Sequence, residues 1–232
     1  MSENLETYLY ISSSTLRIYL YEKKKFQNLY EEELNFINKT ENLNFETLSK
    51  FLDDNIFKIE KSIGKFITNI YLVIENKKIF NAKFCIKKKN YDKIISKKYL
   101  ENTLTEAKDL FKENYQDKKI LHILVNNYSI NGKKYSYFSE NLQGDELSLE
   151  LQFIYISNSF SLLFEKVLEN FQIRIIQYLD GCYIKNFFES DDIHLTEMIS
   201  RIKDGYNKNE IRLVPKNTKK SGFFERFFQL FS

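Results

Sequence analysis

Few side chains in this sequence belong to the types that most often carry out chemistry. There are two histidines, His122 and His194, and two cysteines, Cys85 and Cys182. The cysteines lie far apart in the sequence, and neither has a second cysteine or a histidine at metal-ligand spacing. We therefore expect two buried free thiols, no metal site and no bound cofactor.

The two histidines have patterns typical of structural residues. His122 alternates with aliphatic residues along a predicted strand, and no nucleophile or carboxylate lies at a recognisable spacing from it. His194 follows Asp191 and Asp192, which offer too few ligands for a metal ion. We expect no catalytic residue, a satisfied structural histidine at position 122 and a solvated helix start at position 194.

Four hydroxyl residues, Ser12-Ser13-Ser14-Thr15, follow an apolar run that ends at Ile11. Such a run could cradle an anion with its hydroxyl and backbone groups. It contains no glycine, however, and glycine is the residue that lets a backbone approach a phosphate closely. We therefore expect a plain hairpin turn at this position.

Lysines are densest between residues 87 and 98, where Lys87-Lys88-Lys89 is followed by Lys93, Lys97 and Lys98. This region could contact lipid headgroups or nucleic acid, or it could be a solvated face between a strand and a helix. The whole chain has a net charge of only +3, with lysines and glutamates interspersed. The molecule as a whole is therefore not expected to bind nucleic acid electrostatically.

The composition predicts a folded chain. With 232 residues, of which 43% are hydrophobic, it can form one sizeable domain or two small ones. The N-terminus carries Glu3 and Glu6 instead of a basic segment followed by an apolar one, so we expect no secretory signal. The least polar long stretch, 147–164, is too polar to span a bilayer. These features predict a cytoplasmic protein.

The first 86 residues predict strands around one helix. Runs of β-branched and aromatic residues favour strands at 7–11, 16–21, 26–36, 66–74 and 78–86. Between the third and fourth of these, Leu48, Leu52 and Ile56 recur at helical spacing, so a helix is expected over 45–63, ending near Gly64.

A second group of elements follows, in which Ser96 is a plausible N-cap and Asn131-Gly132 is a strong hairpin signal. Helices are expected at 96–111, 160–171 and 193–202, and strands at 119–130, 135–138, 145–157 and 173–179. The polar stretch 204–220 contains the only proline, Pro215, and is interpreted as a tether. The pattern predicts a small α+β module inserted in a larger sheet-and-helix framework.

The C-terminal residues have the pattern of an amphipathic helix. At about 100° per residue, the apolar side chains occupy an arc of about 160°. The residues expected to bind a membrane are Phe223, Phe224, Phe227, Phe228, Leu230 and Phe231, with Lys219, Lys220 and Arg226 facing anionic headgroups. The alternative is a terminal helix docked on the protein's own core. So short a helix is marginal in water, and we therefore favour reversible attachment to lipid.

The order of these elements, together with this tail, resembles the FtsA family of actin-like bacterial cell-division proteins. The stretch from Asp117 to Gly132 is similar to the family's hxVLHxxPxxYxIDG segment, with Leu121, His122 and Tyr128 in the matching places. The stretch 141–147 resembles the family's NPxGhxGxxL segment. The likeness covers most of residues 5–180 and the last dozen.

The resemblance implies an α+β (α/β-like) fold made of an actin/RNase H-like subdomain 1A, an inserted SHS2-type subdomain 1C, a tether and a C-terminal amphipathic helix. The expected segments are 1–83 and 159–190 for 1A, 84–158 for the 1C-like module, 191–220 for the tether and 221–232 for the membrane-targeting helix. Subdomains 2A and 2B of the family are not expected in this chain.

The sequence departs from the family at its first phosphate loop, which reads roughly Asp-Ile-Gly-Thr-Ser-Lys. The matching positions are Tyr10, Ile11, Ser12, Ser13, Ser14 and Thr15. The carboxylate that directs Mg²⁺ and the glycine are both replaced. The resemblance therefore implies a reduced member of the family with a degenerate phosphate loop and no ATP binding.

The function implied by the resemblance is that of a noncatalytic, membrane-tethered adaptor of cell division, bound peripherally to the cytoplasmic side of the inner membrane at the division site. Its expected partners are membrane lipids and division proteins such as FtsZ, without nucleic acid, and self-association is possible. Two alternatives are a PilM-like adaptor of a pilus or secretion platform, because PilM shares this inserted-module fold, and an actin-like ATPase completed by a partner.

Overall fold

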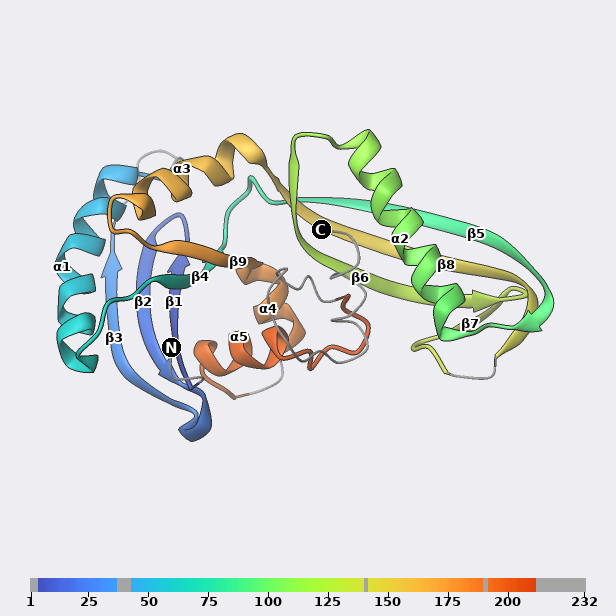
Figure 1. The fold of residues 1–232 in the computed structure, drawn as a ribbon, viewed down its shortest axis with the longest axis horizontal. Coiled ribbons are helices and arrows are strands. Elements are labelled where there is room, and N and C mark those ends of the chain that lie inside the picture. The colour runs from blue at the N-terminus through green and yellow to red at the C-terminus, as the bar shows by residue number, and fades with distance from the viewer. Residues whose placement is uncertain (1–3, 37–42, 140–141, 190–191, 212–232) are drawn as a thin grey trace. The chain divides into compact units, whose positions relative to one another are not determined.

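The computed structural model describes residues 4–36, 43–139, 142–189 and 192–211 (Figure 1). These residues form two compact units. Unit 1 contains the described residues up to 79 together with 157–204, and unit 2 contains 80–156 together with 205–211. Residues 80–156 of unit 2 are therefore inserted in the sequence of unit 1, and residues 205–211 belong to unit 2 again.

Unit 1 is built on a five-stranded mixed sheet with the order β3-β2-β1-β4-β9. Its strands are β1 (Leu5–Ile11), β2 (Thr15–Glu22), β3 (Gln27–Asn35), β4 (Asn69–Ile74) and β9 (Arg174–Asp180). The first three strands pair antiparallel as the predicted meander, with a short 3₁₀ turn, η1 (Lys23–Lys25), between the second and third. By contrast, β1, β4 and β9 run parallel to one another. Parallel neighbours require crossover connections, which the helices supply.

The two faces of this sheet carry different kinds of side chain. Tyr8, Tyr10, Tyr19 and Tyr21 point to one face and pack against α4 (Gly181–Phe187) and α5 (Leu195–Lys203). The aliphatic residues that alternate with these tyrosines point to the opposite face, because successive strand residues face opposite ways. That face is covered by α1 (Phe45–Ile63) and α3 (Asn158–Glu169) (Figure 1).

The predicted helix over 45–63 is confirmed at both ends. The side chain of Asn44 accepts hydrogen bonds from the backbone N–H groups of Glu46 and Thr47, which have no partner within the helix. Gly64 ends the helix in the left-handed conformation with φ of 65°. Local sequence signals therefore mark both ends of this helix, and its apolar face packs in unit 1.

Unit 2 is a four-stranded sheet with α2 (Lys97–Asn114) on one face. Its order is β5-β8-β6-β7, with β5 (Phe80–Ile94), β6 (Lys118–Ile130), β7 (Lys133–Tyr135) and β8 (Gln143–Ser157). Leu100, Leu104 and Phe111 of α2 pack in its core. The predicted N-cap at Ser96 and the predicted hairpin at Asn131-Gly132 are both present.

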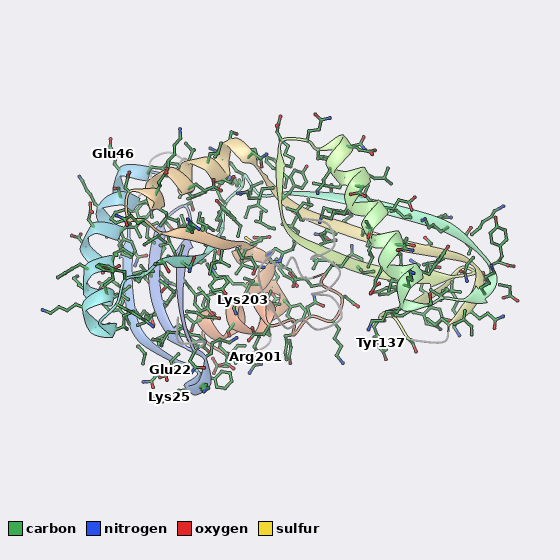
Figure 2. All side chains as sticks on the ribbon, viewed as in Figure 1. Glu22, Lys25, Glu46, Tyr137, Arg201 and Lys203 are labelled. Atoms are coloured by element: carbon green, nitrogen blue, oxygen red, sulfur yellow. The ribbon has the colours of Figure 1, made fainter. Side chains whose placement is uncertain are left out.

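The residues between 192 and 211 differ from the tether expected over 191–220. Residues 195–203 form α5, close to the helix predicted over 193–202, and this helix belongs to the core of unit 1. Lys203 of this helix places its Nζ 2.7 Å from Oε1 of Glu6 (Lys203 is labelled in Figure 2). In unit 2, the N–H of Ile211 donates to the carbonyl of Ile123 at 2.9 Å. Polar composition suggested a tether here, but burial of a few apolar side chains and these bonds order the segment.

The prediction that both cysteines are buried is wrong, because both thiols are exposed. Cys85 lies on β5 between Phe84 and Ile86, which pack against the core beneath α2, so strand alternation turns its side chain to the other face. Cys182 lies in the first turn of α4.

The expected membrane-targeting helix over 221–232 and the remainder of the tether lie outside the described residues. Within the residues that are described, no helix is long and apolar enough to cross a membrane.

Candidate functional site

The candidate site lies where the three parallel strands of unit 1 end. The last residues of β1, β4 and β9 are Ile11, Ile74 and Asp180. Because parallel strands point the same way, the segments that follow them meet at one edge of the sheet. The N–H of Glu75 donates to the carbonyl of Ile11 at 2.8 Å, which fixes the first two ends side by side. Open α/β sheets commonly bind ligands at this edge.

A pocket of about 620 Å³ opens at this edge. Its lining residues come from the β1–β2 turn, the segment after β4 and the start of α4: Ser12, Ser13, Ser14, Glu75, Asn76, Lys77, Lys78 and Cys182. This volume is within the range of small-molecule sites in proteins, about 300 to 1,000 Å³. The chemistry of the pocket therefore depends on whether its polar groups are available to a ligand.

The serine run forms a closed hairpin turn. The N–H of Ser12 donates to the carbonyl of Thr15 at 2.9 Å. The Oγ of Ser12 accepts hydrogen bonds from the N–H groups of Thr15 at 3.0 Å and Ser14 at 3.3 Å. A phosphate cradle needs such N–H groups to point at the ligand. Here two of them bond to a side chain of the turn itself, as expected for a plain hairpin.

Two other residues of the expected phosphate loop lie in strands. Tyr10 is a buried residue of β1, and Thr15 is the first residue of β2. The predicted loop residues that line the pocket are therefore Ser12, Ser13 and Ser14.

The carboxylate of Glu75 is held by two donors. Lys185 Nζ lies 2.6 Å from Glu75 Oε2, and the hydroxyl of Tyr10 donates to the same oxygen at 2.5 Å. Burial by itself would raise the pKa of Glu75, but the hydrogen bonds from Lys185 and Tyr10 lower this pKa below its ordinary value of 4.5. Glu75 is therefore ionised and paired at neutral pH, and is poorly suited to act as a general base.

Asp180 and Cys182, at the same edge, do not offer a ready catalytic group either. The carboxylate of Asp180 is an N-cap, with Oδ1 accepting from the N–H of Cys182 at 3.0 Å. Although Cys182 is exposed, partial desolvation of its thiol, with smaller contributions from Glu75 and Asp180, raises the pKa of this thiol above its ordinary value of 9.0. A thiol with a raised pKa carries little thiolate at neutral pH and is a weak nucleophile.

Glu75, Asp180 and Lys185 were not anticipated as site residues from the sequence. The available signal was that Glu75 and Asp180 each directly follow a predicted strand. If those strands are parallel, the residues after them lie at the same edge. The ion pair between Lys185 and Glu75 could not be anticipated in this way, because the two residues are 110 positions apart in the sequence.

The two histidines occupy structural positions. His122 is fully buried in unit 2, and its Nδ1 lies 2.6 Å from Oε1 of Glu210. The side chain of His194 caps α5, which confirms the predicted helix start at that position. No group of three or more potential metal ligands occurs among the residues that the structure describes. The predicted lipid-binding residues of the tail lie beyond residue 211, outside the described part of the chain.

Comparisons with known proteins identify the fold. No protein-family model and no curated protein matches the sequence. A solved structure of the PilM-PilN type IV pilus biogenesis complex contains a similar chain, with 10% identity, coverage of 78% of this chain and 49% of that chain, and a TM-score of 0.51. A Bacteroides thetaiotaomicron protein of unknown function, described as having an actin-like ATPase fold, matches with 14% identity over 83% of this chain and 58% of its own, with a TM-score of 0.36. The fold is similar to that of the matching chain of the PilM-PilN complex.

A third similarity is to the cytoplasmic domain of EpsL, an inner membrane component of the type II secretion system of Vibrio cholerae. The identity is 8%, the coverage 78% of this chain and 57% of that chain, and the TM-score 0.37. The chain thus spans about half the length of the solved chains it matches. At such low identity, these similarities concern the fold alone.

Proposed function

We propose that this protein is a noncatalytic actin-like adaptor that links proteins of a membrane-associated assembly. The observation that carries the proposal is that polar groups of the pocket at the ends of β1, β4 and β9, named here the strand-end pocket, already bond to one another. The Ser12 side chain occupies N–H groups that a phosphate would need, and Lys185 neutralises Glu75, the carboxylate that lines the pocket. Because these groups already bond to one another, the pocket is better suited to stabilise the fold than to bind nucleotide.

The assembly that we favour is a pilus or secretion platform. The PilM-PilN complex is an assembly for type IV pilus biogenesis, and one of its chains shares this fold. A division-site adaptor that binds FtsZ is the second candidate, favoured by the phenylalanine pattern of the tail. In either assembly, unit 2 would be the SHS2-type module, and its exposed sheet face would be available to a partner.

Attachment to the cytoplasmic side of the inner membrane is assigned to the C-terminal residues 221–232. In the helical pattern, Phe227 is on the apolar face and Gln229 is on the polar face. We expect Phe227→Glu to weaken the sedimentation of the full chain with vesicles that contain anionic lipid, because it removes the contribution of the tail. Gln229→Glu is the matched control, because it adds the same charge on the polar face, and it should leave sedimentation with vesicles nearly unchanged. Equal sedimentation of both variants would contradict this assignment.

Localisation of a fluorescent fusion in living cells tests the choice of assembly. A pilus or secretion adaptor should form foci that coincide with a labelled component of such a platform and that persist when FtsZ is depleted. A division adaptor should gather at mid-cell and disperse on FtsZ depletion. Diffuse fluorescence with the tail intact would contradict both assignments.

A further inference from the structure

Positive charge is concentrated in one short segment of unit 2. Residues 87–98, named here the basic tip, contain six lysines and one aspartate, which gives a formal charge of +5, whereas the whole chain carries only +3. The rest of the chain is therefore slightly negative. Lys88 forms an ion pair with Glu106, and Lys87 lies 4.0 Å from Glu146, but these two carboxylates do not cancel the excess. A local positive field of this kind attracts polyanionic surfaces.

The backbone of the basic tip leaves the regular sheet at the end of β5. Lys89 pairs with Glu146 of β8, but the next paired residue of β5 is Lys93, opposite Gly144. Residues 90–92 thus form a bulge without partners in the β8 register. Tyr91 and Asp92 have φ values of 53° and 54°. Two consecutive non-glycine residues in this left-handed region are uncommon, and such backbone persists only where the surroundings hold it.

Specific side chains hold this bulge in place. Asn90 is buried, and its amide donates to the carbonyls of Lys93 at 2.5 Å and Gly144 at 3.0 Å. The amide of Gln143 also donates to the carbonyl of Asp92 at 2.7 Å. The buried amide of Asn90 therefore stabilises the unusual backbone of this bulge. A regular strand would need neither the bulge nor the buried amide.

The result of this arrangement is an apolar apex surrounded by lysines. Tyr91 is 74% exposed and Ile94 is 59% exposed. Tyrosine is favoured at membrane–water interfaces, where its ring meets the acyl boundary and its hydroxyl stays hydrated. Lysines around such an apex are positioned to meet anionic headgroups.

We propose that the basic tip docks on an anionic lipid surface, with Tyr91 and Ile94 entering the interface. The apolar apex and the absence of arginine from residues 87–98 favour lipid over nucleic acid, because nucleic-acid sites rely on arginine for bidentate contacts to phosphate and bases. This contact is separate from that of residues 221–232 and does not depend on the proposed adaptor function.

The absence of tryptophan from the chain allows a direct test. Tyr91→Trp introduces a single fluorescent reporter at the apex of the full chain. With vesicles of 70% phosphatidylcholine and 30% phosphatidylglycerol, its emission should shift to the blue and be quenched by brominated lipid. The signal should persist when Phe227→Glu is added to the same chain. Phe57→Trp is the matched control, since Phe57 is 69% exposed on α1, and its emission should not change.

Charge dependence completes the test. Replacing Lys89 and Lys93 by glutamine in the Tyr91→Trp chain should weaken its partitioning into these vesicles roughly 30-fold, from the contribution of two lysines near an anionic surface. The proposal is overturned if the tryptophan emission of the Tyr91→Trp chain is unaffected by vesicles, whether or not the chain sediments with them. It is equally overturned if a single-stranded oligonucleotide shifts the emission and anionic vesicles do not.

Discussion

The Nδ1 atom of His122 lies 2.6 Å from Oε1 of Glu210, although the two residues are 88 positions apart in the sequence. Both side chains are buried in unit 2. The bond joins the middle of β6 to the segment 205–211, and the N–H of Val125 donates to the carbonyl of Asn209 at 2.8 Å beside it. Residues 209–211 are therefore held on unit 2 by these bonds.

Glu210→Ala should destabilise unit 2 by about 2 kcal/mol, because it removes the carboxylate that bonds to a fully buried imidazole. Glu210→Gln should cost less, since the amide oxygen can still accept a hydrogen bond. Urea unfolding followed by circular dichroism measures both effects. Lys208→Ala, at an exposed position of the same segment, is the control and should change the free energy of unfolding by less than about 0.5 kcal/mol. A similar small effect for Glu210→Ala would show that the contact does not stabilise the protein.

Lys185→Met should reduce the stability of unit 1 by roughly 1 kcal/mol at pH 7, because the ion pair with Glu75 is only partly buried. The pKa of Glu75 is lowered in the folded state, so its contribution is present above pH 4.5 and is lost as the pH falls through the folded-state pKa. Burial alone would lower the pKa of Lys185, but its bonds to Glu75 and Tyr10 outweigh burial and raise this pKa. Its contribution is therefore lost only as the pH rises above 10.5.

The difference in unfolding free energy between wild type and Lys185→Met should consequently be largest between about pH 4.5 and 10.5 and shrink on either side. Chemical unfolding at a series of pH values measures it. Lys24→Met, in the exposed η1 turn, should give a small and nearly pH-independent difference. A pH-independent difference for Lys185→Met would argue that packing of its alkyl chain, and not its charge, is what matters.

Gly144→Ala should destabilise unit 2 by about 2 kcal/mol, because the new Cβ would lie only 2.4 Å from Cγ2 of Ile130. Gly132→Ala provides a contrast at the neighbouring hairpin. Its Cβ would meet no atom within 4 Å, but φ is +80°, so the cost should be about 1 kcal/mol and arise from the backbone alone. Gly132→Asn should recover part of that loss, while Gly144→Asn should not. The midpoints of urea unfolding for the four variants decide between these effects.

Local signals were enough to predict most of the secondary structure. The helix over 45–63 follows from apolar spacing that ends near Gly64, and the hairpin at Asn131-Gly132 follows from the positive φ that its turn requires. By contrast, α4 is only seven residues long, too short for a helical period to emerge from the sequence. The packing of 205–211 was also missed, because it depends on the pairing of this segment with β6, where Glu210 meets His122.

The candidate site was only half predictable. The run Ser12-Ser13-Ser14 was recognisable in the sequence as a turn without glycine, and the structure places these residues at the pocket. What closes the site is the bond from Lys185 to Glu75, and the pairing of two side chains so far apart is created by parallel strand order. The periodicity of apolar residues predicts strands, but it does not predict the order of those strands in the sheet.

The central claim is that the strand-end pocket does not bind nucleotide and that the chain acts as an adaptor. Isothermal titration calorimetry of the purified full chain with MgATP tests it most directly. The result predicted is no saturable heat at millimolar nucleotide, for the wild type and equally for Lys185→Met. Saturable binding of MgATP in the micromolar range, abolished by substitution of Ser13 and Ser14, would contradict the account.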